Sequence, residues 1–193
     1  MATVNSYTGS VPTPDRTSLD AIVMAARDLL EQDGLPGLTM QAVAERVGVR
    51  APSLYKRVRN RDDLIRLVAE ATLVELAAEL DAANGARKLL GSFRAFGLGR
   101  PAAFRLIMTP GDTPSAAAVS EALAETVSAG ILRTARELAG EQDALFAART
   151  LTAWAAGFVS MELNGGFNLG GDPEDAWEYG LERIVAAISA KQT

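Results

Sequence analysis

The chain has 193 residues and a net charge of −5, with 48% hydrophobic and 22% charged residues, which is ordinary for one or two globular domains. It contains no cysteine and no histidine, which excludes disulfides, thiolate and imidazole metal sites, and catalysis by either side chain. Helix-forming alanine and leucine abound and aromatic residues make up only 6%, so we expect an all-α fold with no metal, no cofactor and no enzymatic activity.

Glycine, proline and helix-capping residues divide the chain into about nine helices. Residues 1–15 are rich in Ser, Thr, Pro and Gly, and we expect them to form a disordered tail. Gly34 and Gly140 are expected to end the helices that precede them. The predicted helices, in chain order, cover residues 18–33, 39–47, 51–57, 60–83, 86–98, 101–108, 115–139, 142–164 and 173–190.

The most informative pattern lies in residues 39–64. Two short predicted helices joined by a tight turn at Gly48 fit a helix-turn-helix, whose second helix enters the major groove of DNA. Residues 46–61 include several Arg and Lys and no acidic residue, which suits a polyanionic partner, although a solvated helix surface has the same composition. The predicted DNA-binding residues are Thr39, Arg50, Ala51, Pro52, Ser53, Tyr55, Lys56, Arg57, Arg59 and Arg61.

The run TMQAVAERVGVRAPSLYKRVRNRDDLI resembles the DNA-binding domain of the TetR family of bacterial repressors. Three residues depart from the family pattern: Arg50 stands where Ser or Thr usually caps the second helix, Arg57 where His often contacts a phosphate, and Val58 where Phe usually fills the core. The residues that match the pattern are Thr39, Val43, Ala44, Gly48, Val49, Leu54, Tyr55, Asp62 and Leu64.

The resemblance implies two domains and a regulatory function. Residues 16–66 would form a three-helix, helix-turn-helix DNA-binding domain, and residues 67–193 a helical ligand-binding and dimerisation domain. The protein would be a ligand-responsive transcriptional regulator, a repressor, that binds a palindromic DNA operator as a dimer and is released by a small, largely apolar effector. The alternative is a small-molecule-binding or scaffold protein whose DNA head is degenerate.

Two features of the C-terminal part support these expectations. Small residues in helix 142–164 and an apolar face on helix 173–190 would allow both helices to pair with a second copy, although packing within one chain would use the same faces. Aromatic and methionine side chains could line an effector cavity, with a filled core as the alternative. The predicted ligand-binding residues are Phe93, Phe96, Phe104, Met108, Trp154, Phe158, Met161 and Phe167, with Arg105, Ser160 and Asn164 as polar candidates.

The sequence gives no indication of membrane association. No stretch reaches the roughly 18 consecutive apolar residues of a membrane span, and the N-terminus lacks the basic and apolar regions of a secretory signal. We therefore expect a cytoplasmic protein without a membrane partner.

Overall fold

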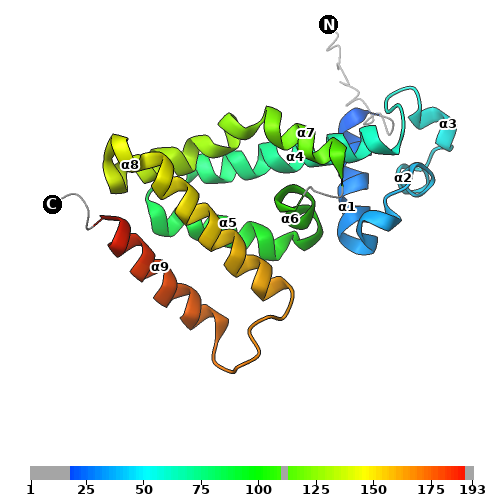
Figure 1. The fold of residues 1–193 in the computed structure, drawn as a ribbon. Helices are drawn as coiled ribbons and strands as arrows, with labels where there is room; N and C mark the ends of the chain where they lie inside the picture. Colours follow the sequence, from blue (N-terminus) through cyan, green and yellow to red (C-terminus); the bar gives the residue numbers. More distant parts are fainter. Residues whose placement is uncertain (1–17, 110–112, 190–193) are drawn as a thin grey trace, which may run out of the picture.

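The computed structural model describes residues 18–109 and 113–189, and all of its regular elements in these ranges are helices. The predicted tail at residues 1–15 lies outside the described residues. The helices are α1 Leu19–Gly37, α2 Met40–Val47, α3 Ala51–Leu54, α4 Arg61–Ala82, α5 Ala86–Gly99, α6 Pro101–Met108, α7 Pro114–Ala122, α8 Ala124–Leu163 and α9 Pro173–Ser189 (Figure 1).

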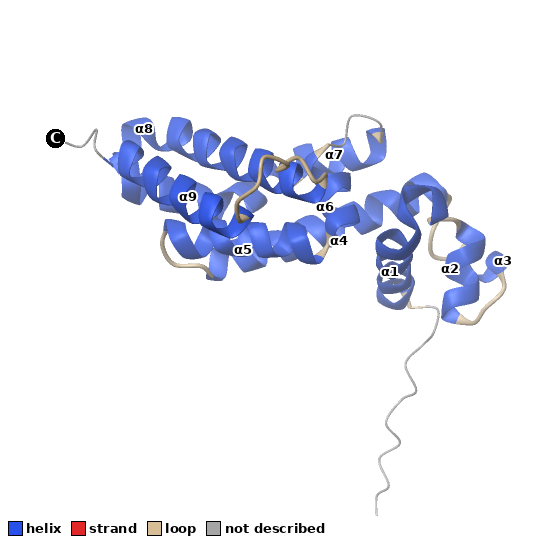
Figure 2. Ribbon diagram, turned by 90° about the horizontal axis from the view of Figure 1, so that it is seen from below, coloured by secondary structure: helices blue, strands red, loops and turns tan. Residues whose placement is uncertain are grey.

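The helices form two groups that share α4. Helices α1, α2 and α3 cluster at one end of the molecule, called the head below, and α3 is its outermost helix (Figure 2). Helix α4 leaves the head and continues into a bundle, called the body, where it packs against α5, α7 and α8, while α9 packs on α8. The head touches the body through contacts of α1 with α4 and α6.

Side-chain caps begin several of the helices where the sequence predicts them. The Thr39 hydroxyl accepts the N–H of Ala42 at 3.1 Å, and Asn60 Oδ1 accepts the N–H of Asp63 at 2.8 Å. Asp172 Oδ1 accepts an N–H at the start of α9 at 2.9 Å. These bonds satisfy backbone donors that have no partner within their own helix.

Two boundaries differ from the sequence prediction, and two agree with it. Helix α3 has four residues rather than seven, and the chain leaves it through a turn. The helix predicted over 115–139 is divided at Leu123, where neither glycine nor proline marks the break. Gly34 and Gly140 adopt left-handed φ values of 69° and 76° with ψ values of −174° and 171°, so each interrupts the helical backbone between two helical segments, as the sequence predicts.

Helix α8 is the one helix of the described ranges that is long and apolar enough to cross a membrane, judged by length and composition. The core helix of a soluble protein meets the same criteria, and α8 packs against α4, α5 and α9.

The close packing of α8 on α4 depends on the absence of a side chain at Gly130. A Cβ atom at this position would lie 2.9 Å from the carbonyl oxygen of Leu80 and 3.3 Å from the backbone nitrogen of Asp81. Backbone atoms cannot rotate away as the end of a side chain can, so the two helices would have to separate.

We expect Gly130→Ala to lower the free energy of unfolding by about 1–3 kcal/mol, because the methyl group overpacks the α4–α8 contact. The matched control is Gly91→Ala in α5, where an added Cβ meets no atom within 4 Å. There the gain in helix propensity should stabilise the protein by up to about 1 kcal/mol. Chemical denaturation of both variants measures the difference, and equal effects would contradict the proposed close contact.

Candidate nucleic-acid interface

The head has the geometry of a helix-turn-helix. Helix α2 ends at Gly48, which is left-handed at φ 75° and ψ 35°, and the N–H of Val49 donates to the carbonyl of Ala44 at 2.9 Å. This turn redirects the chain into α3, where Pro52 occupies the first turn without loss of a helical hydrogen bond. Arg50 begins α3 without a side-chain cap.

The apolar face of α2 and α3 holds this arrangement against α1 and α4. Val43, Leu54, Val58 and Leu64 are fully buried. Val58, which replaces the aromatic residue of the family pattern, therefore still fills a core position.

The predicted DNA-binding residues share one end of the molecule, on the N-terminus of α2, on α3 and on the loop that follows it (Figure 1). Tyr55 has 55% of its surface exposed although it is aromatic, which makes its ring available to a partner. The exposed members of the set are Arg50, Pro52, Tyr55, Lys56, Arg57 and Arg59, and the half-buried members are Thr39, Ala51, Ser53 and Arg61.

Arg61 has partners within the protein. Its Nε donates to the carbonyl of Leu38 at 2.8 Å, and its Nη2 donates to the carbonyl of Leu35 at 2.6 Å. The guanidinium group thus ties the start of α4 to the α1–α2 connector. This contact places Arg61 beside Thr39, and its role in DNA binding stays a prediction.

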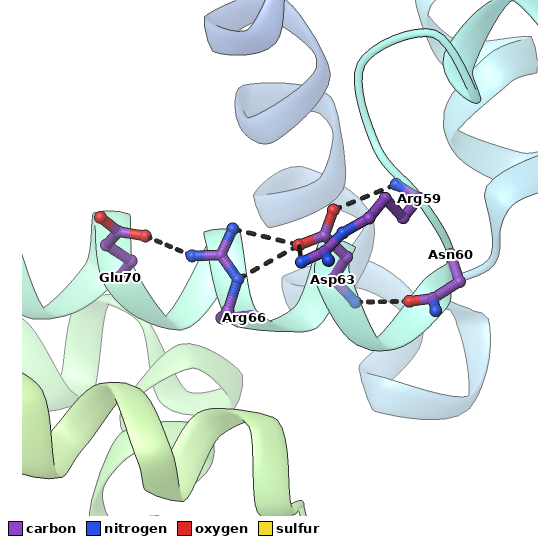
Figure 3. Close-up of polar contacts among 5 residues, drawn as sticks. All are labelled: Arg59, Asn60, Asp63, Arg66 and Glu70. Atoms are coloured by element: carbon purple, nitrogen blue, oxygen red, sulfur yellow. Dashed lines mark hydrogen bonds and ion pairs between the residues drawn. The ribbon is translucent and has the colours of Figure 1, made fainter.

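Asp63 organises the loop between α3 and α4 (Figure 3). Its Oδ2 accepts the backbone N–H of Arg59 at 3.0 Å, and its Oδ1 pairs with the Arg66 guanidinium at 3.1 Å. Asn60 accepts the N–H of Asp63 in return. The hydrogen bond from the Arg59 N–H has the largest effect on the pKa of Asp63. Together with the side chains of Arg59 and Arg66, it outweighs the effect of partial burial and holds the pKa of Asp63 below 3.8.

The structure separates the predicted ligand-binding residues into two groups. Phe93 and Met108 line a largely, though not fully, enclosed cavity of about 70 Å³ between α4, α5, α6 and α8, called the enclosed cavity below. Phe104 packs on Phe93 with ring centroids 5.5 Å apart in an edge-to-face arrangement, and Phe96 is buried next to Arg100. The remaining residues that line the cavity are Leu76, Leu80, Leu89, Leu90, Val127, Ser128, Ile131, Thr152 and Ala155.

The second group packs α9 onto α8. Trp154 stacks on Trp177 at 4.6 Å, and Phe158 contacts both Trp177 at 5.1 Å and Phe167 at 4.7 Å. These aromatic rings contact one another and do not line the enclosed cavity. Met161, the last of the predicted set, has 47% of its surface exposed.

Arg94 completes this aromatic cluster, and sequence reasoning missed it. Its guanidinium lies 5.1 Å from the Trp177 ring centroid and forms two hydrogen bonds with Glu162, at 2.8 and 2.9 Å, and one with Glu174 at 2.5 Å. The hydrogen bonds that Arg94 donates to Glu162, followed by the one it donates to Glu174, raise the pKa of Arg94 above its ordinary value despite burial. A lone arginine on a predicted helix face gives no sequence signal for partners this distant.

The three polar candidates lie outside the enclosed cavity. Arg105 donates to the carbonyl of Leu163 at 3.1 Å and to Asn164 Oδ1 at 3.3 Å, and Asn164 donates to Ser160 at 3.5 Å. They join α6 to the end of α8 at the surface.

The two helices predicted to pair with a second copy carry an exposed apolar groove. Its volume is about 450 Å³, and Phe146 on its edge has 65% of its surface exposed. The groove is lined by Ala139, Asp143, Phe146, Ala147, Thr150, Ile184, Ala187 and Ile188.

Comparison with known proteins gives two family matches. Residues 22–68 match the model of bacterial regulatory proteins of the tetR family, and residues 86–184 match a tetracyclin repressor-like C-terminal domain. The chain is 32% identical over 168 residues to an uncharacterized HTH-type transcriptional regulator of Mycobacterium tuberculosis, which covers 81% of this chain and 75% of that relative.

Two further relatives are similar over different lengths. The tetracycline repressor protein class A from transposon 1721 of Escherichia coli is 45% identical over 56 residues, which is 29% of this chain and 26% of that repressor. The fold is similar to that of a protein of unknown function from Rhodococcus sp. RHA1, with a TM-score of 0.74 at 21% identity over 95% of this chain and 99% of that chain.

We expect Asp63→Ala to lower the free energy of unfolding by about 1 kcal/mol at neutral pH, because the Arg59 amide loses its acceptor. Since folding lowers the pKa of Asp63, its stabilisation is present above pH 3.8 and is lost as the pH falls through the folded-state pKa. The difference between native protein and variant should therefore shrink below pH 3.8 in denaturation experiments. Asp62→Ala, an exposed neighbour, is the control, and an equal effect there would contradict this role of Asp63.

Proposed function

Because the chain belongs to the tetR family of bacterial regulatory proteins, whose activity is DNA-binding transcription regulation, we propose that it is a ligand-responsive repressor. It would act in the cytoplasm, bind a palindromic operator as a homodimer and leave the operator when a small effector binds. The observation that carries this proposal is the exposed, cationic α3 segment at the far end of the head.

The proposed DNA contacts follow from the position of each side chain. Residues 16–66 form the DNA-binding domain, and α3 enters the major groove with Ala51 and Pro52 giving the backbone room to approach. Arg50, Ser53 and Lys56 contact or flank base edges. The residues that hold the phosphate backbone are Thr39, Tyr55, Arg57, Arg59 and Arg61.

A homodimer would place two heads on one face of the DNA. Helix-turn-helix dimers contact half-sites about 34–36 Å apart, so the pairing surface must hold both heads in one direction. The exposed groove between α8 and α9 supports pairing of these helices across a two-fold axis, because Phe146 and Ala187 remain open to solvent in a single chain.

The enclosed cavity supports an apolar effector bound by residues 67–193. No charged side chain lines it, and Ser128 and Thr152 supply hydroxyl groups at its wall. Phe93 and Met108 are the predicted ligand-binding residues that reach it. The cavity is smaller than the 300–1,000 Å³ of usual ligand sites, so an effector would have to widen it and would favour the widened state.

We expect Lys56→Ala to weaken binding to all duplex sequences and to lower the salt dependence of log K by about one unit, because one phosphate contact is lost. Fluorescence anisotropy over a salt series, with DNA from the intergenic region upstream of the gene, measures both quantities. Lys88→Ala removes an equivalent exposed positive charge from α5 in the body, and it should change neither the affinity for DNA nor its salt dependence. An unchanged slope for Lys56→Ala would exclude a phosphate contact.

We expect Phe146→Arg to weaken self-association at least about tenfold, because it buries an unpaired charge in the proposed pairing surface. Sedimentation velocity over a concentration series measures the dimer fraction. The matched control is Val74→Arg, which charges another exposed apolar residue, on α4, with 52% of its surface open. A dimer that survives Phe146→Arg as well as it survives Val74→Arg would contradict pairing through α8 and α9.

A further inference from the structure

A carboxylate from the head caps a helix of the body. Glu31 of α1 accepts the N–H of Ala103 on Oε1 at 2.8 Å and the N–H of Ala102 on Oε2 at 3.0 Å. Helix α6 has no side-chain cap of its own, since its N-cap residue Arg100 makes none, and Pro101 has no N–H to offer. Both free donors of the first turn of α6 are therefore satisfied by a residue of the head.

A second carboxylate strengthens the same junction. Glu75 of α4 pairs with Arg27 of α1 and with Arg100, the residue between α5 and α6. Partial burial acts to raise the pKa of Glu75, but the hydrogen bonds from Arg100 and Arg27 outweigh it and leave that pKa below its ordinary value. The start of α6 is thus tied to α1 directly by Glu31 and indirectly through Glu75.

The other end of α6 reaches the enclosed cavity. Met108, its last residue, lines that cavity, while Ala103 at its start touches Glu31. The helix has eight residues, so a rod about 12 Å long joins the cavity to the head.

Of the helices around the cavity, α6 is the shortest. Helices α4, α5 and α8 are longer, and α4 and α8 pack on each other without room for a methyl group at Gly130. The contact of α6 with α1 is flanked by a groove of about 300 Å³ on the Glu31 side and one of about 270 Å³ on the Leu35 side. A ligand that widens the cavity would therefore act on the shortest of these helices, whose contact with α1 has an open groove on each side.

We propose that Glu31 couples the effector cavity to the DNA-binding head, by holding the start of α6 so that displacement of Met108 moves α1. This inference rests on the proposed function and adds the residue that transmits the signal. Glu31 acts through α6 and touches neither effector nor DNA, so it is a positioning residue. Removing its cap should leave DNA affinity intact and abolish the response to a filled cavity.

The test uses a side chain as a permanent stand-in for the effector. Ala155 is fully buried and lines the cavity, so Ala155→Phe fills and widens it. The wild-type protein first selects its preferred duplex from a random library, and anisotropy then gives the affinities of four proteins: wild type, Ala155→Phe, Glu31→Gln and the double variant. Asp28→Asn, alone and with Ala155→Phe, is the matched control, because Asp28 lines the same groove one turn away in α1.

We expect Ala155→Phe to weaken duplex binding about tenfold in the native background, within the usual range of coupling between sites. With Glu31→Gln the same substitution should cost less than about threefold, and with Asp28→Asn still about tenfold. An equal loss with and without Glu31, or no loss in the native background, would overturn the role of Glu31. A wild-type protein that selects no duplex would instead refute the proposed function.

Hydrogen exchange provides a readout that does not require DNA. Ala155→Phe should speed amide exchange in residues 19–33 of α1 when Glu31 is present and leave it unchanged with Glu31→Gln. Acceleration that is the same in both backgrounds would show that Glu31 does not transmit the displacement. If Ala155→Phe fails to fold, Ser128→Leu fills the same cavity from its wall with a smaller side chain and takes its place in both experiments.

Discussion

Helix α4 packs against α1 in the head and against α5, α6, α7 and α8 in the body, so this one helix determines how the head sits relative to the body. Leu64 and Ile65 belong to the core of the head, whereas Leu76 and Leu80 line the enclosed cavity in the body. Because one helix carries both sets of residues, its first turn must be fixed before the head can have a defined orientation. Two hydrogen bonds supply that fixed start: Asn60 accepts the N–H of Asp63, and the Asp63 carboxylate accepts the N–H of Arg59.

The cationic surface of the head depends on internal pairing of some of its own charges. Arg61 and Arg66 are engaged by backbone carbonyls and carboxylates, and this positions the loop on which Lys56 and Arg59 are displayed. Helix α3 has only four residues and would not persist alone in water. Its helical conformation is held by the burial of Leu54 and by the turn at Gly48. The positions of the exposed cationic residues of the head therefore depend on these two residues.

The sequence predicts the helix caps correctly, because they depend on chemistry within a few residues of the chain. Thr39, Asn60 and Asp172 cap helices as expected, because a side-chain oxygen two or three residues before a free N–H acts locally. The break at Leu123 could not be predicted, since it depends on packing between distant helices. The aromatic residues show the same limit: their spacing indicates burial, but Phe93 borders a cavity while Phe158 packs on Trp177, and only tertiary structure separates the two. Arg94 was missed because Glu162 and Glu174 meet it only in the folded chain.

The size of the enclosed cavity links stability to regulation. The contacts that fill an apolar space of about 70 Å³ are worth roughly 1–2 kcal/mol. A ligand that restores these contacts gains a free energy of this order, and the coupling between sites in proteins is commonly about 1–3 kcal/mol. The two quantities are comparable, so in the proposed mechanism a small apolar molecule would have enough free energy to move α6, provided that the displaced state retains the rest of the core. The long contact of α4 with α8 would retain it, and the short α6, held by Glu31 at one end, would then be the element on which that free energy acts.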